Sequence, residues 1–425
     1  SCRGLGVVVA IAFMAVLVIV NFLGIRMLAH TNSTITWWKV GIPLLTIFVV
    51  GFANFHGGNF HALGGFNPYG AKGVLSAVST SGIVFAYLGF EQADQLAGEA
   101  KNPQRNIPRA VIGSVVIGII IYMALQVVFI GALPASVLHG TWSTVESTFT
   151  GPWAQVASLA SIGWLAVVLY VDAVISPSGT GLIYATATSR VSYGLSRNGY
   201  FPPVFESVDR RGVPWFGLLT AFVIGSICFL PFPSWTSLVG LITSASVLMY
   251  AGAPLALGVF RRRLPNAIRP YRMKGASVLS PIAFILANYI IMWSGWKTDW
   301  KLGIAIVIGY VLVAVNAVGG FNSIKPDWKL RAASWLLPYL IGTGVLTYGS
   351  AWGNMKHPWF GSSDVWWDLA ILGVFSLVIY YWAMAVALPA EEIEATINAV
   401  VVPEETVLTS SPSGIPGGAG VLGAT

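Results

Sequence analysis

Three carboxylates lie within otherwise apolar stretches of the sequence. Glu91 and Asp94 end the run FAYLGFEQAD, and Asp172 lies inside a second run. A charge at the centre of a bilayer costs about 2.5–3.5 kcal/mol on insertion scales, so such residues face a partner or a cavity rather than lipid. Residues three apart share one helix face, and burial favours protonation of a carboxylate. These acids therefore predict a site that binds a polar ligand or exchanges protons.

Each of these acids also has a purely structural interpretation. Glu91 can cap a half-helix, and Asp94 can pair with Gln95 or with a neighbouring span. The sequence shows no partner for Asp172. Both interpretations stay open at this point, although acids at membrane depth are functional by default.

The composition decides which elements position these acids. Of 425 residues, 56% are hydrophobic and 9% are charged, and the mean hydropathy is +0.74, values that exclude a soluble domain. Runs long enough to cross a bilayer, about 20 residues each, recur about eleven times. They cover residues 5–25, 36–55, 74–98, 109–133, 153–189, 214–231, 236–260, 277–296, 301–319, 333–351 and 365–388. The sequence predicts an all-α polytopic membrane protein.

The basic residues predict how the chain is oriented. Most of the 23 Lys and Arg fall in alternate loops, which indicates that these loops are cytoplasmic. This alternation is kept only if 153–189 is one long, tilted span, despite Pro177 and Gly179 inside it. The first residue is then outside and the tail inside. Because the span count is odd and the chain does not begin with Met, we interpret it as lacking an odd number of upstream helices.

Several other classes of function are excluded or disfavoured. The formal charge of +7 is spread over separate loops, so it reflects topology and not nucleic-acid binding. Two cysteines exclude a disulfide framework, and His56 and His61 lie in a Gly-rich loop that we interpret as a connector and not as a metal site. No Walker, GxSxG or HExxH pattern is present, which argues against an ATP-driven pump and a membrane hydrolase. We expect that the protein is not an enzyme, that it binds no metal and no cofactor, and that the lipid bilayer is a partner.

The segment before Glu91 predicts a broken helix over residues 85–91. Gly89 follows the aromatic pair Phe85 and Tyr87, and a glycine there lets the helix open and frees backbone N–H and C=O groups. Irregular backbone at membrane depth is tolerated only where it is buried or lines a cavity. Broken helices of this kind build the substrate sites of secondary transporters.

Three segments resemble the amino acid, polyamine and organocation (APC) permeases. FAYLGFEQADQLAGEAKNPQRNIPRA is similar to the sixth helix of that family and its following loop. NFLGIRMLAHTNSTITWWKVGIPLLTI and SRVSYGLSRNGYFPPVFESVDRRGVPW resemble the connections from the fourth to the fifth and from the eighth to the ninth helix. The resemblance covers about residues 5–320.

The resemblance implies a fold of five plus five inverted-repeat helices, of which the first three are absent here. Residues 1–55 would then be the last two helices of the first repeat, and 74–260 the second repeat. Residues 277–388 would form four additional helices, as in the branch of bacterial proton-coupled aspartate permeases. We expect 389–425 to be a disordered cytoplasmic tail.

The resemblance also implies roles for individual residues around the break. Gly89 would be the break itself, and Phe85 and Tyr87 would be candidates for an aromatic lid over the substrate. Glu91 would link gating to protonation. Asp94 lies beside it, as a further substrate or gating candidate.

The proton-coupling candidates lie on two other helices. Lys39 matches a lysine that replaces a sodium ion in proton-coupled relatives, but it can also extend to lipid headgroups behind Trp37 and Trp38. Near Pro177 the long span contains three hydroxyl residues, Ser176, Ser178 and Thr180. Their hydroxyl groups can form hydrogen bonds with Lys39, or these small residues can simply allow close helix packing. Asp172 lies about one turn away on the same helix.

The sequence as a whole predicts a permease that moves amino acids by alternating access, with protons as the coupled ion. An exchanger or polyamine carrier on the same fold is the alternative within transport. A binding protein that does not transport, or a truncated remnant, is the alternative outside it. Neither the amino acid nor the oligomeric state follows from the sequence.

Overall fold

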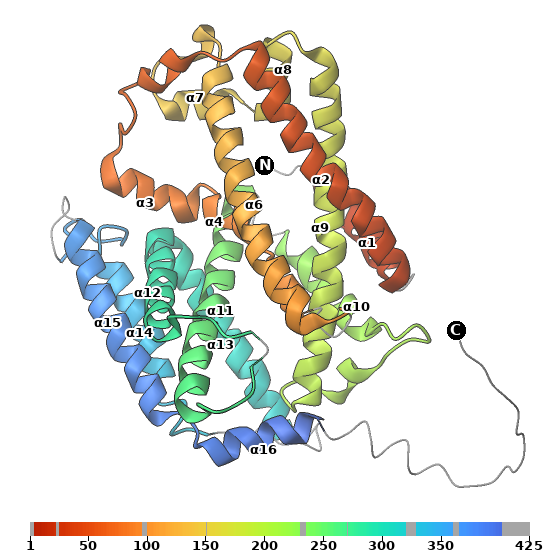
Figure 1. Ribbon diagram of the computed structural model, residues 1–425, viewed down its shortest axis with the longest axis vertical. Coiled ribbons are helices and arrows are strands. Elements are labelled where there is room, and N and C mark those ends of the chain that lie inside the picture. Colours follow the sequence, from red (N-terminus) through yellow and green to blue (C-terminus); the bar gives the residue numbers. More distant parts are fainter. Residues whose placement is uncertain are drawn as a thin grey trace, which may run out of the picture.

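The computed structural model describes residues 4–22, 25–95, 100–149, 151–229, 235–269, 271–319, 329–359 and 365–401, and all regular structure in this part of the chain is helical (Figure 1). The helices are α1 (Gly4–Asn21), α2 (Ile25–Ala53), α3 (Gly70–Thr80), α4 (Ile83–Tyr87), α5 (Gln92–Gln95), α6 (Pro103–Ala132), α7 (Trp142–Thr148), α8 (Pro152–Leu159), α9 (Gly163–Arg197), α10 (Trp215–Cys228), α11 (Trp235–Arg263), α12 (Ala276–Ser294), α13 (Trp296–Gly319), α14 (Leu336–Gly349), α15 (Val365–Val386) and α16 (Ala390–Val401). Short 3₁₀ turns are η1 (Gly57–His61), η3 (Ala135–Val137) and η4 (Pro203–Glu206).

The helix lengths confirm an all-α polytopic membrane protein. Seven helices in the described ranges are long and apolar enough to cross a bilayer, or eight if the bent pair of Gly70–Thr80 and Ile83–Asp94 is one span. The shorter apolar helices α1, α10 and α14 lie where three further spans are predicted. The total of about eleven spans and the inverted repeat stay predictions.

The outer faces of these helices are apolar, as are the faces that pack against other helices. Ile19, Ile120 and Val374 are each more than half exposed, and many other aliphatic side chains on the long helices are exposed as well. A protein in water does not keep so much contiguous apolar surface uncovered. These faces are therefore the surfaces that meet lipid.

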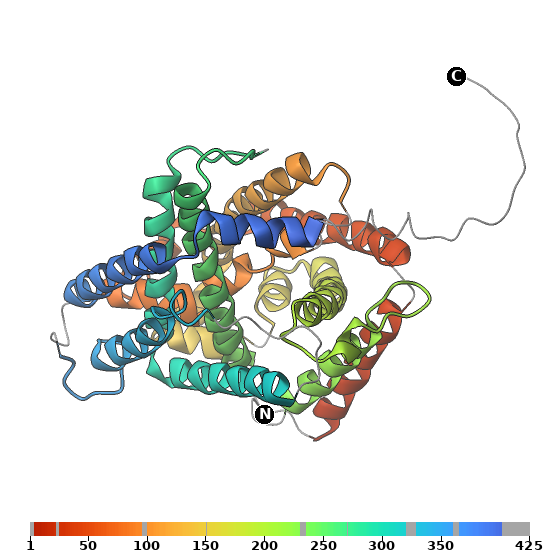
Figure 2. The same ribbon diagram turned by 90° about the horizontal axis from the view of Figure 1, so that it is seen from below.

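The helices form two groups, which Figures 1 and 2 show on opposite sides of the molecule. The core of the first group includes Val50, Val128 and Leu165, and joins α2, α6, α8 and α9. The core of the second includes Phe284 and Ile379, and joins α11, α12, α14 and α15. The broken segment connects the two groups, because α3 packs against α11 and α12 whereas α5 packs against α6 and α9.

The predicted span 153–189 is two helices and not one, and only α9 is long enough to cross a bilayer, so the number of crossings is unchanged. After α8, Ser161 adopts a left-handed conformation with φ of 62°. The N–H of Ile162 donates to Ala157 O at 2.9 Å and the N–H of Ser161 donates to Ser158 O at 3.0 Å. These two bonds form a Schellman motif, which satisfies the last carbonyls of a helix and ends it. The helix α9 that follows is one continuous 35-residue helix through Pro177.

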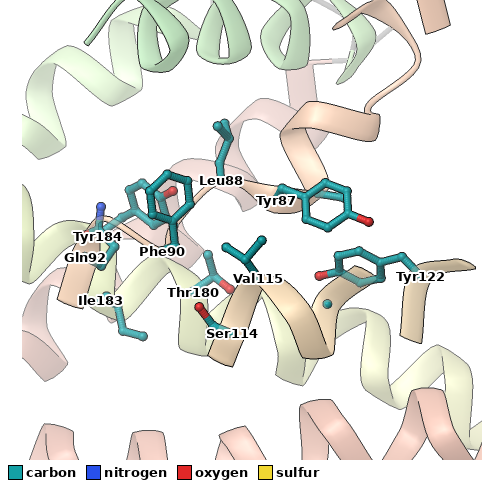
Figure 3. A pocket seen from close by; sticks show the side chains of 13 residues that line it. Tyr87, Leu88, Phe90, Gln92, Ser114, Val115, Tyr122, Thr180, Ile183 and Tyr184 are labelled. Carbon is teal, nitrogen blue, oxygen red and sulfur yellow. The ribbon is translucent and has the colours of Figure 1, made fainter. Parts of the chain in front are cut away.

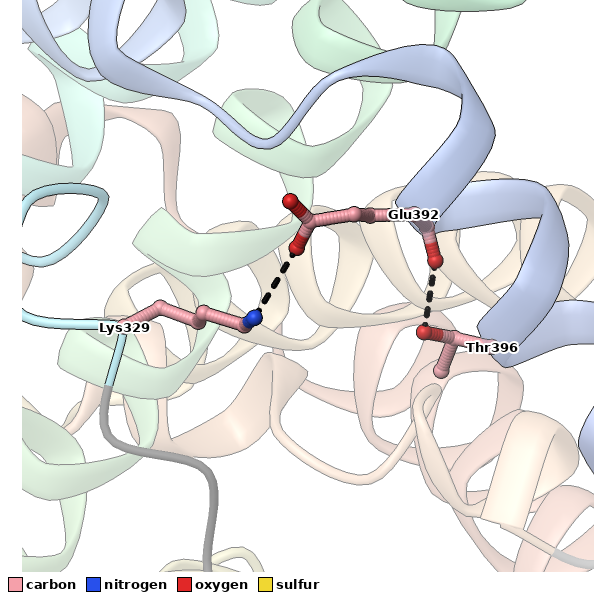
Figure 4. A network of polar contacts seen from close by, with 3 residues as sticks. All are labelled: Lys329, Glu392 and Thr396. Atoms are coloured by element: carbon pink, nitrogen blue, oxygen red, sulfur yellow. Dashed lines mark hydrogen bonds and ion pairs between the residues drawn. The ribbon is translucent and has the colours of Figure 1, made fainter.

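The prediction of a disordered tail is wrong for residues 390–401, which form α16. Two glutamates occupy its first turn, where the helix dipole favours negative charge, and Ile393 is buried. Lys329 forms an ion pair with Glu392 at 3.1 Å, and the hydroxyl of Thr396 donates to the Glu392 carbonyl (Figure 4). This half-exposed ion pair contributes about 0–1 kcal/mol, so burial of Ile393 and the helix dipole matter at least as much. Residues 402–425 lie outside the described ranges.

The close contact between α2 and α9 depends on Gly179. An ideal Cβ built on Gly179 would lie 2.6 Å from Cγ2 of Ile35 on α2, a distance that real Cβ atoms do not reach. Gly194 on the same helix has no atom within 4 Å of such a Cβ. Substitution of the two glycines by alanine can therefore distinguish a steric requirement for glycine from its general effect on helix stability.

We expect Gly179→Ala to destabilise the protein by about 1–3 kcal/mol, because the added methyl group overpacks the α2–α9 contact. Gly194→Ala should be neutral or stabilise it by up to about 1 kcal/mol, since alanine is the better helix former. The measurement is the midpoint of thermal unfolding of both variants in one detergent. Equal midpoints would show that α2 and α9 do not need the glycine.

Candidate functional site

The predicted break at Gly89 is present, and a second break precedes it. Gly82, which precedes α4, has a φ of 86°, and Gly89 has a φ of 107°, between α4 and α5. Residues with side chains rarely adopt such angles, so glycine is required where the chain leaves the helix at position 89. Leu88 is extended. The backbone from Leu88 to Glu91 is thus free of the regular helical hydrogen-bond pattern.

The Glu91 carboxylate ties this open backbone to another helix. Its Oε2 accepts a hydrogen bond from the N–H of Gly89 at 2.8 Å and another from the Tyr250 hydroxyl of α11 at 2.5 Å. Its Oε1 accepts from Nε2 of Gln92 at 3.2 Å. Hydrogen bonds to an ionised acceptor are the stronger ones. Glu91 therefore replaces the lost helical partner of Gly89 and fixes the break against α11.

Asp94 is less closely involved than its spacing suggests. It lies in the first turn of α5, as predicted, and its backbone N–H donates to the Glu91 carbonyl at 3.0 Å. Its side chain is exposed and takes no part in the contacts of the Glu91 carboxylate. The two acids are neighbours in the chain, but only Glu91 joins two parts of the fold.

A cavity of about 260 Å³ lies beside the break, between the segment 86–92, α6 and α9 (Figure 3). The rings of two of its tyrosines, Tyr87 and Tyr122, lie edge to face at 5.3 Å. Gly89 itself lines the cavity, and the hydroxyl of Tyr184 would lie 3.6 Å from a Cβ built there. The lining residues are Ala86, Tyr87, Leu88, Gly89, Phe90, Gln92, Ser114, Val115, Gly118, Tyr122, Thr180, Ile183 and Tyr184.

This lining is suited to a small molecule with polar and apolar parts. It combines tyrosine, serine and threonine hydroxyls, one amide and open backbone with aromatic and aliphatic surface, and it includes no charged side chain. Ligand sites characteristically combine apolar surface with a few placed polar groups. Of the residues predicted around the break, Tyr87 and Gly89 line the cavity, whereas Phe85, Glu91 and Asp94 do not.

Lys39 reaches the edge of this cavity. Its Nζ donates to Oγ1 of Thr180 at 2.6 Å, and Thr180 also lines the cavity. The hydroxyl of Ser178 donates to the Val174 carbonyl of its own helix, and Ser178 is not the residue that accepts from Lys39. Thr180 is therefore the one predicted hydroxyl that joins Lys39 to the cavity in the described structure.

Asp172 has the partner that the sequence does not reveal. Its Oδ1 accepts a hydrogen bond from Nε1 of Trp38 at 2.8 Å and one from the hydroxyl of Ser176 at 2.5 Å. It also acts electrostatically on Lys39, which follows Trp38 on α2. Asp172 therefore belongs to the same α2–α9 contact as Lys39 and Thr180.

Besides Tyr87, three tyrosines of the site are not predicted from the sequence. Tyr122, Tyr184 and Tyr250 each lie in an apolar run, on three different helices, and all three come to the break. A hydroxyl group within an apolar span needs a partner, which is a usable signal. The sequence contains fifteen tyrosines, however, and only the fold shows which of them converge.

Comparison with known proteins gives one family and several relatives. The amino acid permease family matches residues 3–313. The aspartate-proton symporter of Bacillus subtilis (strain 168) is 34% identical over 391 residues, or 92% of this chain and 74% of that protein. The glutamate/serine transporter AimA of the same strain is 35% identical over 393 residues, or 90% and 70%. The branched-chain amino acid permease BcaP of Lactococcus lactis subsp. cremoris (strain MG1363) is 28% identical over 329 residues, or 72% and 65%.

The contact between Tyr250 and Glu91 can be tested by stability alone. We expect Tyr250→Phe to destabilise the protein by about 1.5–3 kcal/mol, because a hydrogen bond to a charged group is lost. Tyr170→Phe is the control, since that side chain is 55% exposed. In a double-mutant cycle with Glu91→Gln, thermal unfolding should give a coupling of about 0.5–3 kcal/mol. Additive effects would mean that the two side chains do not interact.

Proposed function

The chain belongs to the amino acid permease family, and we propose that it is a secondary transporter that moves a polar amino acid across the cell membrane by alternating access, together with protons. It is a multi-pass membrane protein. The single observation that carries this proposal is the cavity at the break of the span, which Lys39 meets through Thr180. The proposal involves no chemical step on the substrate.

The lining of the cavity supports an amino acid as substrate. The segment from Leu88 to Glu91 is not regular helix, and its carbonyls from Gly89 to Glu91 accept only turn hydrogen bonds in the described structure. In transporters, broken helices use such backbone to bind the α-carboxylate and the α-amino group of a substrate. Ser114, Gln92 and Thr180 offer partners for a polar side chain. Two relatives are named for aspartate and for glutamate and serine, which are all polar amino acids. The proposed substrate is therefore a small polar or acidic amino acid.

Lys39 is the first proposed site of proton coupling. A charged ammonium donates to the Thr180 hydroxyl, as in the structure, whereas a neutral amine would accept a hydrogen bond from the same hydroxyl. In the structure Thr180 donates its own proton weakly to the Ser176 carbonyl at 3.4 Å, and toward a neutral Lys39 it would turn that proton away from the carbonyl. The protonation state of Lys39 is thereby linked to the hydrogen bonding that a substrate meets.

Glu91 is the second proposed site of proton coupling. As an ionised acceptor, its Oε2 holds both Gly89 and Tyr250. A proton on this carboxylate weakens both bonds, because a protonated oxygen is a poorer acceptor. The open backbone would then be released from α11. This gives the proton a physical means of loosening the broken segment, which is the segment that lines the cavity.

The test is uptake of labelled aspartate, glutamate, serine and leucine into proteoliposomes that contain this chain, with and without an imposed pH gradient. We expect gradient-driven accumulation of at least one polar amino acid and none of leucine. Empty liposomes and a proton-conducting ionophore are the controls. Correctly inserted protein that accumulates none of the four would contradict the proposed function.

The proposed roles of the two charged residues are tested in the same assay. We expect Lys39→Met to lose the pH-gradient dependence while exchange of internal for external substrate persists, and Glu91→Gln to reduce net uptake about tenfold or more. Lys72→Met and Glu394→Gln are matched controls, because both side chains are exposed. If the site variants and the controls behave alike, these assignments are wrong.

We also propose that residue 1 lies on the outer side and α16 on the cytoplasmic side. The basic last turn of α11, with Arg261, Arg262 and Arg263, supports this orientation, because basic residues are retained in the cytoplasm. With Cys2 and Cys228 replaced by serine, an impermeant maleimide should label His139→Cys in intact cells. Val208→Cys should be labelled only after permeabilisation. The reverse result would invert the topology.

A further inference from the structure

A second cavity, of about 380 Å³, lies between α11, α12, α13 and α14. It is distinct from the first, with which it shares no lining residue, and most of its surface is aliphatic. A volume of this size is within the range of about 300–1,000 Å³ that small-molecule sites occupy. The lining residues are Leu248, Ile291, Asp299, Leu302, Gly303, Ile306, Val307, Tyr310, Leu337, Tyr339, Leu340, Ile341, Thr343 and Gly344.

Asp299 is the one acid in this apolar lining. Both of its carboxylate oxygens are buried, and among the described residues the Thr347 hydroxyl of α14 lies close enough to donate to one of them. The hydroxyl of Thr343, one helical turn earlier on α14, is buried without a partner among the described residues. Buried polar atoms are nearly always satisfied, so the remaining carboxylate oxygen and the Thr343 hydroxyl call for an explanation.

The nearby lysines do not supply that explanation. Lys297 and Lys301 are each two residues from Asp299 on the same helix. Residues two apart are about 200° apart around a helix, so both lysines point away from the cavity that Asp299 faces. A buried carboxylate without a compensating cation costs free energy. A donor or a cation that enters the cavity would offset this cost.

The cavity opens on the face of the protein that meets lipid. Its lining residues Val307, Leu337 and Ile341 are 61%, 66% and 63% exposed. These side chains come from α13 and α14, so the entrance lies between these two helices. A ligand that reaches Asp299 by this way must first dissolve in the bilayer, which selects a molecule with an apolar body.

We propose that this cavity binds an amphiphilic amine, a molecule with one cationic nitrogen and an apolar body. The ammonium group donates to the Asp299 carboxylate and to the Thr343 hydroxyl, and the apolar body lies against Leu302, Ile306 and Leu340. A free amino acid does not fit this chemistry, because its α-carboxylate would have no basic partner here and would face Asp299. A neutral lipid chain has no cationic group that could pair with the Asp299 carboxylate.

The proposed site shares one helix with the transport cavity. Leu248 of α11 faces the second cavity, whereas Tyr250, two residues later, faces Glu91 at the break. Residues at this spacing lie on nearly opposite sides of a helix. An occupant of the second cavity would thus contact the helix that holds Glu91, without touching any residue of the first cavity.

The test uses three probes with the same apolar body: 4-phenylbutylamine, 4-phenylbutanol and 4-phenylbutyrate. Binding to the purified chain in lipid nanodiscs is measured by isothermal titration calorimetry, with empty nanodiscs subtracted. We expect saturable binding of the amine, and binding of the alcohol and the acid weaker by about tenfold or more, because only the amine replaces the missing cation. Equal binding of the amine and the alcohol would overturn the proposal, and so would the absence of saturable binding.

Two variants locate the site. Asp299→Asn should weaken binding of the amine by about tenfold or more and leave the alcohol unchanged. Gly303→Leu should also abolish binding of the amine, because a Cβ at Gly303 meets nothing within 4 Å and the side chain would fill the cavity. Glu394→Gln and Gly309→Leu are the controls, the first on an exposed surface and the second at an open position of α13 outside the lining. If the amine binds Gly303→Leu as it binds the unchanged chain, the site lies elsewhere.

Discussion

The constraint on which the site depends is that backbone groups inside a membrane need partners. Where the chain leaves the helix at Gly89, a backbone N–H loses its helical acceptor, and in hydrocarbon such a loss costs several kcal/mol. The Glu91 carboxylate replaces that acceptor and, with the same oxygen, accepts from Tyr250. The opening of the helix, the position of the carboxylate and the contact with α11 are thus parts of one arrangement. The cavity lies beside this arrangement and is lined by the open backbone.

A second set of polar contacts joins α2 to α9. Gly179 allows the helices to approach, Lys39 meets Thr180, and Trp38 meets Asp172. None of these polar groups faces lipid unpaired, which fits the high cost of a lone charge at this depth. Because Thr180 also lines the cavity, this helix contact is connected to the proposed substrate site. Each set of contacts thus joins a protonatable group, Glu91 or Lys39, to a residue that lines the cavity.

The two groups of helices contribute differently to the two cavities. The first cavity lies between the broken segment and helices of the first group, α6 and α9, whereas the second cavity lies wholly within the later helices α11–α14. Helix α11 takes part in both, since Leu248 faces one cavity and Tyr250 contacts Glu91 at the other. The later helices thereby support the break through α11. They also contain a buried acid that the proposed transport mechanism does not use.

The sequence by itself determined the fold class, because composition and runs of apolar residues report directly whether a chain meets lipid or water. It also determined the break, since a glycine at an opening helix and an acid two residues later are local features. The contact of Lys39 with a hydroxyl near Pro177 was predicted from a resemblance, and in the structure its partner is Thr180, one of the three candidates.

The sequence did not predict which distant residues contact each other. The bonds of Tyr250 to Glu91 and of Trp38 to Asp172 join positions 159 and 134 residues apart. Nor could local pattern show that α8 ends in a Schellman motif, or that 390–401 becomes helical when Ile393 finds a buried position. Hydrophobicity and glycine act through the nearest neighbours in the chain, so the sequence reports them. The convergence of hydroxyls and carboxylates depends on how helices pack, and only the tertiary structure decides it.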